Sequence, residues 1–435
     1  MTKSTTSSDL IERLRESRGR SARDIAATVH RLIISGDLAP GTRLPTVRAI
    51  AVVLGVSAAT VSEAWGLLRR GGLLDSRRRN GTFVRGPVPL SLGVLDLSRP
   101  APDSRLLPSI VAALTSGAHE LEHADHGGVS PVLVRAVEPE LPFPAEAWLV
   151  ADGLAAAIRC GVRAFAGPGE TIAVAAPLAP HLLDALRGSG AHLVQVECDG
   201  DGPRLEGLRR VLERKPKALV LPTSTYLACG HSCTAQRAQE LAAELAGTGV
   251  GVLEVDELGP LSPRTPSLGR WLPERVLLAR SYDGAFGPSL RVCVVVGGAA
   301  PVDRIRSRFA ADPIGPSPIL QNAVAHLIVD PVARQAVDLA REHYDHRREA
   351  LGRALVGRAL TTDHRAGLGV WVRVSDSAAV KAALDRRGVV VIPDDRCYPE
   401  SSPGTHIGMV AGCLPDDHRT ADAVADLVAA ANARR

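Results

Sequence analysis

Residues 41–84 read GTRLPTVRAIAVVLGVSAATVSEAWGLLRRGGLLDSRRRNGTFV and decide the fold of the N-terminal part of the chain. Thr46 is expected to cap a short helix, VRAIAVVLG, that ends at Gly55. Ser57 is then expected to cap a second helix, SAATVSEAWGLLRRGG, which carries an apolar face. Two short helices joined by a Gly-containing turn predict a helix-turn-helix.

The flanking residues complete the predicted module on both sides. Residues 22–35 place apolar side chains at helical spacing, and GDLAPG then breaks that helix. After the third helix, LLDSRRRNGTFV reads as two short strands around Asn80-Gly81, a strong hairpin signal. A hairpin that follows a helix-turn-helix is a wing.

This stretch resembles the winged helix of GntR-type bacterial transcription regulators, through LPT-V-R, LGVS--TV--AW--L---G-L and GTFV. The resemblance implies double-stranded operator DNA as partner, with the third helix in the major groove and Arg48 on the backbone or a guanine. Many family members have Arg where Ala58 stands, so guanine readout there is lost. The predicted DNA-binding residues are Arg43, Thr46, Arg48, Ser57, Ala58, Thr60, Ser62, Arg77, Arg78, Arg79, Gly81 and Thr82. A winged helix used for protein contacts is the alternative.

The charge distribution agrees with this assignment. Residues 1–86 hold 15 Lys and Arg against 7 Asp and Glu, a balance of +8, whereas the whole 435-residue chain carries +4. A basic module on a mildly acidic body predicts a polyanionic partner for the module alone. No long apolar run indicates a membrane span and no signal peptide is recognised, so a cytoplasmic protein is expected.

The rest of the chain alternates helices with strands rich in Val, Leu and Ile. The predicted strands are 171–176, 192–197, 218–223, 251–256, 275–280 and 291–297. This alternation indicates an α/β fold with a mostly parallel sheet covered on both faces. A helical region at roughly 316–360 and a small C-terminal α+β lobe follow.

This body resembles fold-type I aminotransferases, which are pyridoxal phosphate (PLP) enzymes, over nearly all of 105–435. A winged helix joined to such a body is the layout of MocR-type regulators, in which the aminotransferase-like domain binds PLP and senses a ligand. The resemblance implies a homodimer. The expected domains are a winged helix at 1–85, a linker at 86–105, a large aminotransferase-like domain at 106–330, and a C-terminal helix with the small lobe at 331–435.

The cofactor motif of that family is altered in this chain. It runs Ser-Phe-Ser-Lys, then three residues, Pro, two residues and Arg, and aligns with SYDGAFGPSLR at 281–291. Gly284 stands at the lysine that forms the Schiff base, and glycine offers no amine. The chain has only four lysines, namely Lys3, Lys215, Lys217 and Lys381. PLP is therefore not expected as a cofactor.

Other cofactor positions differ as well. Val255 stands at the Asp that pairs with the pyridine nitrogen, and Glu257 at a Tyr. Ala179 stands at an aromatic residue, and His406 aligns with the arginine that binds a substrate carboxylate. Ser281 and Arg291 still match phosphate contacts, with a structural ion pair as the other interpretation of Arg291. The predicted ligand-binding residues are Gly153, Leu154, Ala179, Tyr226, Asp256, Ser281, Gly284, Arg291 and His406.

Three functions remain open at this point. The first is a DNA-binding regulator, not an enzyme, whose body dimerises and senses an effector, larger and more apolar than PLP, in the former cofactor cleft. The second is a PLP-binding regulator or aminotransferase that uses an unrecognised lysine. The third is a ligand-free dimeric scaffold for the winged helices. No metal is expected, because Cys229, His231 and Cys233 supply too few ligands for a zinc site.

Overall fold

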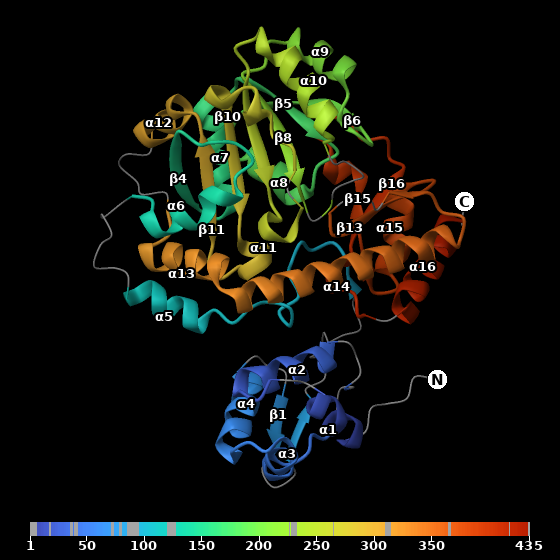
Figure 1. Ribbon diagram of the computed structural model, residues 1–435. Coiled ribbons are helices and arrows are strands. Elements are labelled where there is room, and N and C mark those ends of the chain that lie inside the picture. The colour runs from blue at the N-terminus through green and yellow to red at the C-terminus, as the bar shows by residue number, and fades with distance from the viewer. Residues whose placement is uncertain are drawn as a thin grey trace. The chain divides into compact units, whose positions relative to one another are not determined.

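The computed structural model comprises two units, Met1–Leu95 and Asp96–Arg435. It describes residues 7–16, 19–34, 38, 42–70, 74–77, 81–84, 95–119, 128–225, 227, 233–263, 265–308, 315–363, 367–416 and 418–433. Figure 1 shows the helices and strands of both units. Among the described residues, no helix combines the length and apolar character that a membrane crossing requires.

The N-terminal unit is a winged helix-turn-helix. Its elements are α1 (Ser7–Glu16), α2 (Ala22–Ile34), α3 (Val47–Leu54), α4 (Ala58–Arg70), β1 (Leu74–Arg77) and β2 (Gly81–Val84). The two strands pair antiparallel, with Leu74 opposite Val84. The predicted caps are confirmed at α3, where the Thr46 side chain accepts a hydrogen bond from the Ala49 amide and Gly55 ends the helix at φ 64°.

An apolar core holds this unit together. Ile25 and Val29 of α2, Ile50 of α3 and Val61 and Trp65 of α4 are buried in one cluster. The spacing of these side chains follows the helical period, which is why the pattern was readable from the sequence. Helix α1 also contributes buried leucines to the cluster, an element that the sequence patterns did not predict.

The body is built on an eight-stranded sheet in the order β4-β11-β10-β9-β8-β5-β6-β7. The strands are β4 (Ala147–Asp152), β5 (Thr171–Ala176), β6 (His192–Asp199), β7 (Gly202–Pro203), β8 (Ala218–Ser224), β9 (Gly251–Asp256), β10 (Val276–Ser281) and β11 (Val292–Gly297). Strands β6, β5, β8, β9 and β10 run parallel, and β11 runs antiparallel to both of its neighbours. The carboxyl ends of β4, β5, β8, β9 and β10 therefore meet at one edge of the sheet.

Helices cover the sheet, as the near-continuous apolar strands require (Figure 1). The helices of the large domain are α5 (Val111–His119), α6 (Pro131–Val137), α7 (Leu154–Phe165), α8 (Pro180–Arg187), α9 (Leu205–Leu212), α10 (Ala235–Ala246), α11 (Asp283–Phe286), α12 (Ala299–Arg308) and α13 (Pro318–Val329), of which α5 and α6 pack on α13. Short 3-10 turns lie at Glu138–Glu140, Gly259–Leu261, Leu268–Arg270, Pro273–Arg275, Asp394–Cys397 and Ala411–Cys413. The predicted α/β architecture is confirmed.

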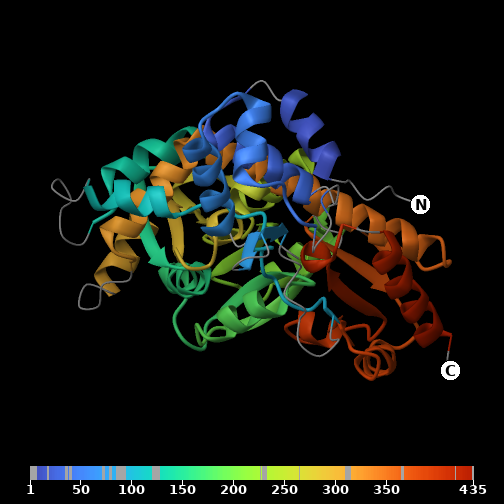
Figure 2. The same ribbon diagram turned by 90° about the horizontal axis from the view of Figure 1, so that it is seen from below.

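A long helix, α14 (Pro331–Val356), leads to the small lobe (Figure 1, Figure 2). The lobe has a four-stranded antiparallel sheet in the order β12-β13-β16-β15. Its elements are β12 (Thr362–Asp363), β13 (Gly369–Arg373), α15 (Ser377–Asp385), β14 (Val389–Val390), β15 (Ile392–Pro393), β16 (His406–Val410) and α16 (His418–Asn432).

The predicted linker at 86–105 is only partly separate from the body. Strand β3 (Leu95–Asp96) pairs with β14, and the Asp103 amide donates a hydrogen bond of 2.8 Å to the Tyr344 hydroxyl. Residues 95–105 thus pack on the body, whereas residues 86–94 lie outside the described residues.

Candidate functional site

The first candidate site is the N-terminal end of α4 in the winged helix. The Ser57 hydroxyl accepts a hydrogen bond of 3.0 Å from the Thr60 amide and lies 2.8 Å from the Thr60 hydroxyl. Ala58 and Ser62 are exposed, whereas Thr60 is half-buried. The opposite face of α4 packs in the core. The exposed face is therefore free to enter a groove of DNA, as a recognition helix does.

Helix α3 presents its own N-terminal turn. Thr46 caps the helix, and Arg48, the second helical residue, is exposed. An exposed arginine beside uncapped helix amides suits contact with a phosphate.

The wing brings Arg43 to the hairpin. The Arg43 backbone bridges Phe83, and the Leu44 amide donates to the Thr82 carbonyl at 2.9 Å. A Cβ built at Gly81 would lie 3.0 Å from Arg43 Nε, so a glycine there leaves room for the guanidinium. The Arg77 side chain and residues Arg78 and Arg79 lie outside the described part of the structure.

Sequence reasoning passed over Glu63 on the recognition helix. Glu63 is exposed next to Ser62, and Ala59 lies four positions before it, on the same side of α4. A carboxylate in the major groove accepts a hydrogen bond from the amino group of cytosine. The helical period of the exposed positions was the signal that would have found it.

The second candidate site is the sheet edge in the body. Asp152, Ser224, Asp256 and Ser281 are the last residues of β4, β8, β9 and β10. Ligands bind at the carboxyl ends of strands in open α/β sheets. Gly284 lies buried in α11, directly after β10. This edge therefore corresponds to the place where the family resemblance puts the cofactor.

The residues at this edge do not fit a covalently bound PLP. Lys217 directly precedes β8, so it lies at the opposite edge of the sheet, where it pairs with Glu170 at 3.6 Å. Seven residues of β8 span roughly 20 Å. Lys215 lies beside Lys217, Lys381 belongs to α15 in the small lobe, and Lys3 lies outside the described residues. Lys215 and Lys217 therefore lie away from the Schiff-base position, and Lys381 pairs with Asp385 on its own helix.

Asp256 is the centre of a buried polar cluster. It accepts hydrogen bonds from the Ser224 hydroxyl and, at 3.1 Å, from the Gly259 amide. Arg280 Nη1 donates to the second carboxylate oxygen at 2.6 Å. Arg280 is largely buried and pairs also with Glu140 at 3.4 Å. Val255, at the position of the family's pyridine-pairing Asp, is buried. These contacts tie the ends of β8, β9 and β10 together at Asp256.

Ala179 and its neighbours form a further part of the edge. Ala179 is buried at the N-terminus of α8 and offers no ring for stacking on a cofactor. His181 of α8 hydrogen-bonds through Nε2 to the buried Glu257 carboxylate. Burial lowers the pKa of His181, but the Glu257 charge outweighs this and raises it above the usual value. The pair favours an imidazolium held by a carboxylate.

Arg291 is engaged by an acidic partner. Its Nε and Nη2 donate to the two carboxylate oxygens of Asp152 at 2.8 and 3.1 Å. The pair is exposed at the surface. Gly153 adopts φ 79° and precedes α7, whose first residue, Leu154, is half-buried. The structure thus brings Gly153, Leu154, Ser281, Gly284 and Arg291 together at the end of β4 and β10.

His406 belongs to the sheet of the small lobe and not to the sheet that carries this group. His406 lies in β16 of the small lobe, stacks on Trp371 with ring centroids 5.5 Å apart, and lies 3.1 Å from the Thr405 hydroxyl. Burial lowers its pKa. Tyr226 lies outside the described residues.

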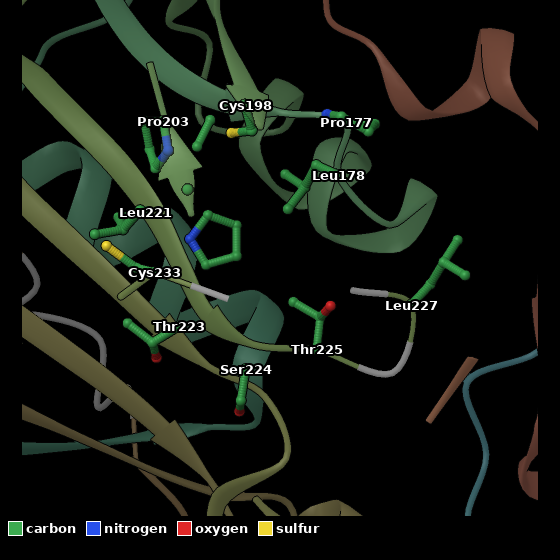
Figure 3. Close-up of a pocket in the computed structure, with 13 residues that line it drawn as sticks. Pro177, Leu178, Cys198, Pro203, Leu221, Thr223, Ser224, Thr225, Leu227 and Cys233 are labelled. Carbon is green, nitrogen blue, oxygen red and sulfur yellow. The ribbon is translucent and has the colours of Figure 1, made fainter. Parts of the chain in front are cut away.

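A shallow hollow that opens to solvent lies at the same sheet edge beside β5, β6 and β8 (Figure 3), with a cavity volume of about 20 Å³, room for about one water molecule. It is lined by Ala175, Pro177, Leu178, Cys198, Gly202, Pro203, Leu221, Pro222, Thr223, Ser224, Thr225, Leu227 and Cys233. Apolar walls with a few hydroxyl and thiol groups are typical of small-molecule sites. Burial raises the pKa of Cys233 to about 12, so its thiol stays protonated at neutral pH. The lining residues do not coincide with the predicted ligand-binding residues.

Within the part of the chain that the structure describes, no group of three or more His, Cys, Asp or Glu could hold a metal ion. Cys229 and His231, considered with Cys233 above, lie outside that part.

Comparison with known proteins bears on the winged helix and on the fold of the body. Residues 21–84 match the family described as bacterial regulatory proteins, gntR family. The chain is 27% identical to the vitamin B6 salvage pathway transcriptional repressor PtsJ of Salmonella typhimurium, over 92% of this chain and 96% of that protein. It is 24% identical to the pyridoxine biosynthesis transcriptional regulator PdxR of Corynebacterium glutamicum, over 74% and 75% of the two chains.

The solved structures define the fold of the body. A multiple substrate aminotransferase from Thermococcus profundus superposes with a TM-score of 0.68 at 18% identity, over 80% of this chain and 94% of that one. An aspartate aminotransferase variant from Thermus thermophilus gives 0.67 at 20% identity, over 80% and 100%. The body therefore has the fold-type I aminotransferase fold.

These findings define the class of protein. The chain is a DNA-binding transcription regulator with an N-terminal GntR-type winged helix and an aminotransferase-like body. Its two-part organisation and its relatives support a MocR-type regulator.

Proposed function

We propose that the protein binds operator DNA as a homodimer and that its body senses a small molecule without covalent PLP. The exposed N-termini of α3 and α4 and the bridge between Arg43 and the wing support the DNA contact. A dimer would present two winged helices to two half-sites, which multiplies the modest affinity of one module. Base specificity then rests on Thr60, Ser62, Arg48 or the wing, since Ala58 carries no hydrogen-bonding group.

The observation that carries the proposal for the body is Gly284 at the position of the Schiff-base lysine, with Lys217 at the far edge of the sheet. Without an amine there, the body has no means of forming the covalent bond that aminotransferase chemistry begins with. We therefore propose that the chain is not an enzyme. The hollow beside β5, β6 and β8 has room for about one water molecule, so it would have to widen before the body could receive a small, largely apolar ligand there.

A second candidate is a regulator that responds to PLP. The names of two relatives, which concern vitamin B6 and pyridoxine, favour it. It needs either another lysine or a purely non-covalent PLP site. A scaffold without any ligand is the remaining alternative.

Addition of PLP to the full-length protein separates these functions. We expect no visible absorbance band of a protein aldimine and no rise in melting temperature, because Gly284 provides no amine. An aldimine band that one of the substitutions Lys215→Arg, Lys217→Arg or Lys381→Arg abolishes would overturn the proposal. Each Lys→Arg substitution keeps the positive charge at its position while it removes the primary amine.

A thermal-shift screen then distinguishes sensing from scaffolding. A compound that binds the native body raises its melting temperature by mass action and should also change retardation of the DNA upstream of the protein's own gene. A compound that raises the melting temperature without changing DNA retardation would show that the body binds a ligand but does not regulate DNA binding. Failure of the full-length protein to retard any DNA would contradict the regulatory function itself.

A further inference from the structure

Three features of the body would be needed to hold a phosphate at the sheet edge. They are the Ser281 hydroxyl, the Arg291 guanidinium and the N-terminus of α7 behind Gly153, where backbone amides point outward. We call these three features, together with Asp152 and Asp283, the cradle. Each of the three binds an anion only while its donors are available to the ligand.

The guanidinium of Arg291 is already paired. Asp152 is opposite Val292 in the antiparallel register of β4 and β11, so Arg291 emerges directly beside it. Nε and Nη2 of Arg291 meet the two carboxylate oxygens at 2.8 and 3.1 Å, the fork geometry that a phosphate would otherwise use. Arg291 adopts φ 49°, an uncommon conformation for a residue other than glycine, and this backbone aims the side chain at Asp152.

The N-terminus of α7 faces a second carboxylate. A Cβ built at Gly153 would lie 3.8 Å from Asp283 Oδ2, so this oxygen sits over the first turn of the helix. Asp283 occupies the place of the second serine in the Ser-Phe-Ser-Lys motif. An acidic side chain therefore replaces the neutral hydroxyl donor that the family has at this position.

The serine that remains is buried. Ser281 is 2% exposed, and its hydroxyl accepts a hydrogen bond of 3.3 Å from the Asp283 amide. The cradle thus holds one guanidinium and two carboxylates. The exposed Arg291–Asp152 pair adds little to the stability of the fold, but it cancels the positive charge that would attract an anion.

Burial raises the pKa of Asp283 to about 6, with Arg291 lowering it and Asp152 raising it. At neutral pH the carboxylate is still mainly ionised. The formal charge of the cradle is then −1, whereas a phosphate site needs a positive one.

We infer that Asp152 and Asp283 fill the anion cradle of the aminotransferase fold, so that the body rejects phosphate and its effector carries no phosphate group. The inference deepens the proposed function, since it names a class of ligand that the sensing body excludes. Binding of PLP without a covalent bond is excluded by the same charges, because its phosphate is a dianion at neutral pH.

Titration of the full-length protein with inorganic phosphate at constant ionic strength tests this inference by calorimetry and thermal shift, without DNA or effector. We expect no phosphate-specific binding by the natural protein at low millimolar concentrations. The double variant D152N/D283S should gain at least about tenfold in phosphate affinity, since like charges across a site are strongly unfavourable. Adding R291Q to the double variant should abolish the gain.

The variant D303N is the matched control. Asp303 also forms an exposed ion pair with an arginine, Arg306, at 3.2 Å, but away from the cradle. It should leave phosphate affinity unchanged. Phosphate binding by the natural protein that R291Q removes would overturn the inference, and so would a folded double variant without any gain. Neither result depends on DNA binding or on the aldimine test, so a failure here is distinguishable from a failure of the proposed function.

Discussion

We propose that individual side chains at the helix N-termini determine how the winged helix meets DNA. The Thr46 and Ser57 hydroxyls cap the two helices. They accept hydrogen bonds of 3.2 Å from the Ala49 amide and 3.0 Å from the Thr60 amide. Arg48 is exposed in the first turn of α3, two residues after the cap Thr46. The caps hold the helices, and the arginine supplies the charge, so the two residue types have separable effects.

Arg48→Ala should weaken operator binding by about 1–3 kcal/mol, or roughly 5- to 150-fold in Kd, because a charge-assisted contact is lost. Fluorescence anisotropy with labelled operator measures the change. Arg23→Ala, which removes an exposed arginine from α2, is the control and should bind nearly as well as the natural protein. Equal loss in both variants would show that Arg48 contributes only to net charge.

Helix α4 is the element on which the DNA contact depends most. Its N-terminus is tied by the Ser57 hydroxyl, and its apolar face is buried through Val61, Trp65 and Leu68. Glu63 and Ser62 lie on the exposed side. The helical period of the sequence predicts which positions of α4 are buried. Which of the exposed positions contact bases depends on how the helix is placed on the DNA.

Ser57→Ala should destabilise the first turn of α4 by about 1 kcal/mol, the usual cost of a lost cap. Amide hydrogen exchange in that turn should therefore accelerate roughly fivefold in the full-length protein. Ser62→Ala makes the same change of residue type on the exposed face and should alter exchange little. An unchanged rate in Ser57→Ala would mean that water satisfies the orphan amides equally well.

Across the whole body, Arg347 joins segments that are distant in sequence. It is 1% exposed at the side chain and pairs with Asp103, within the predicted linker, at 3.0 Å, and with Asp416 before α16, at 2.7 Å. The Gly412 carbonyl is a third hydrogen-bond partner. A buried cation with these partners stabilises the junction of the large domain, α14 and the small lobe only while the set stays complete.

Arg347→Met should destabilise the body by about 3–5 kcal/mol, because it leaves Asp103 and Asp416 without their buried partner. Calorimetry of the full-length protein follows the unfolding transition of the body. Arg306→Met, at an exposed pair, should change the unfolding free energy by less than about 0.5 kcal/mol.

The same cluster predicts a pH dependence. Burial raises the pKa of Asp416, but hydrogen bonds from His343 and Arg347 outweigh it and hold the pKa below the ordinary 3.8. A depressed carboxyl pKa stabilises the fold fully above the unfolded value, and this contribution is lost as the pH falls below it. Arg347→Met should therefore flatten the decline in stability below about pH 4.

Much of the architecture could be predicted from local patterns. The caps Thr46 and Gly55, the hairpin before Gly81 and the Val-rich strands depend on residues a few positions apart, so their signals survive in the sequence. Strand β4 and helices α1, α5 and α6 were not predicted. Their short apolar segments become regular only when distant partners pack on them, as β11 does on β4.

The candidate site, like the fold, could be predicted from the sequence only in part. The sequence was sufficient for the winged helix and the α/β body, because each is a property of neighbouring residues, whereas Gly284 at the lysine position stays a prediction. It could not show that Asp152, 139 residues from Arg291, pairs with that arginine, or that Asp283 lies over the start of α7. The pairing of β4 with β11 brings these charged groups together, because an electrostatic interaction depends on distance in space and not on separation along the sequence.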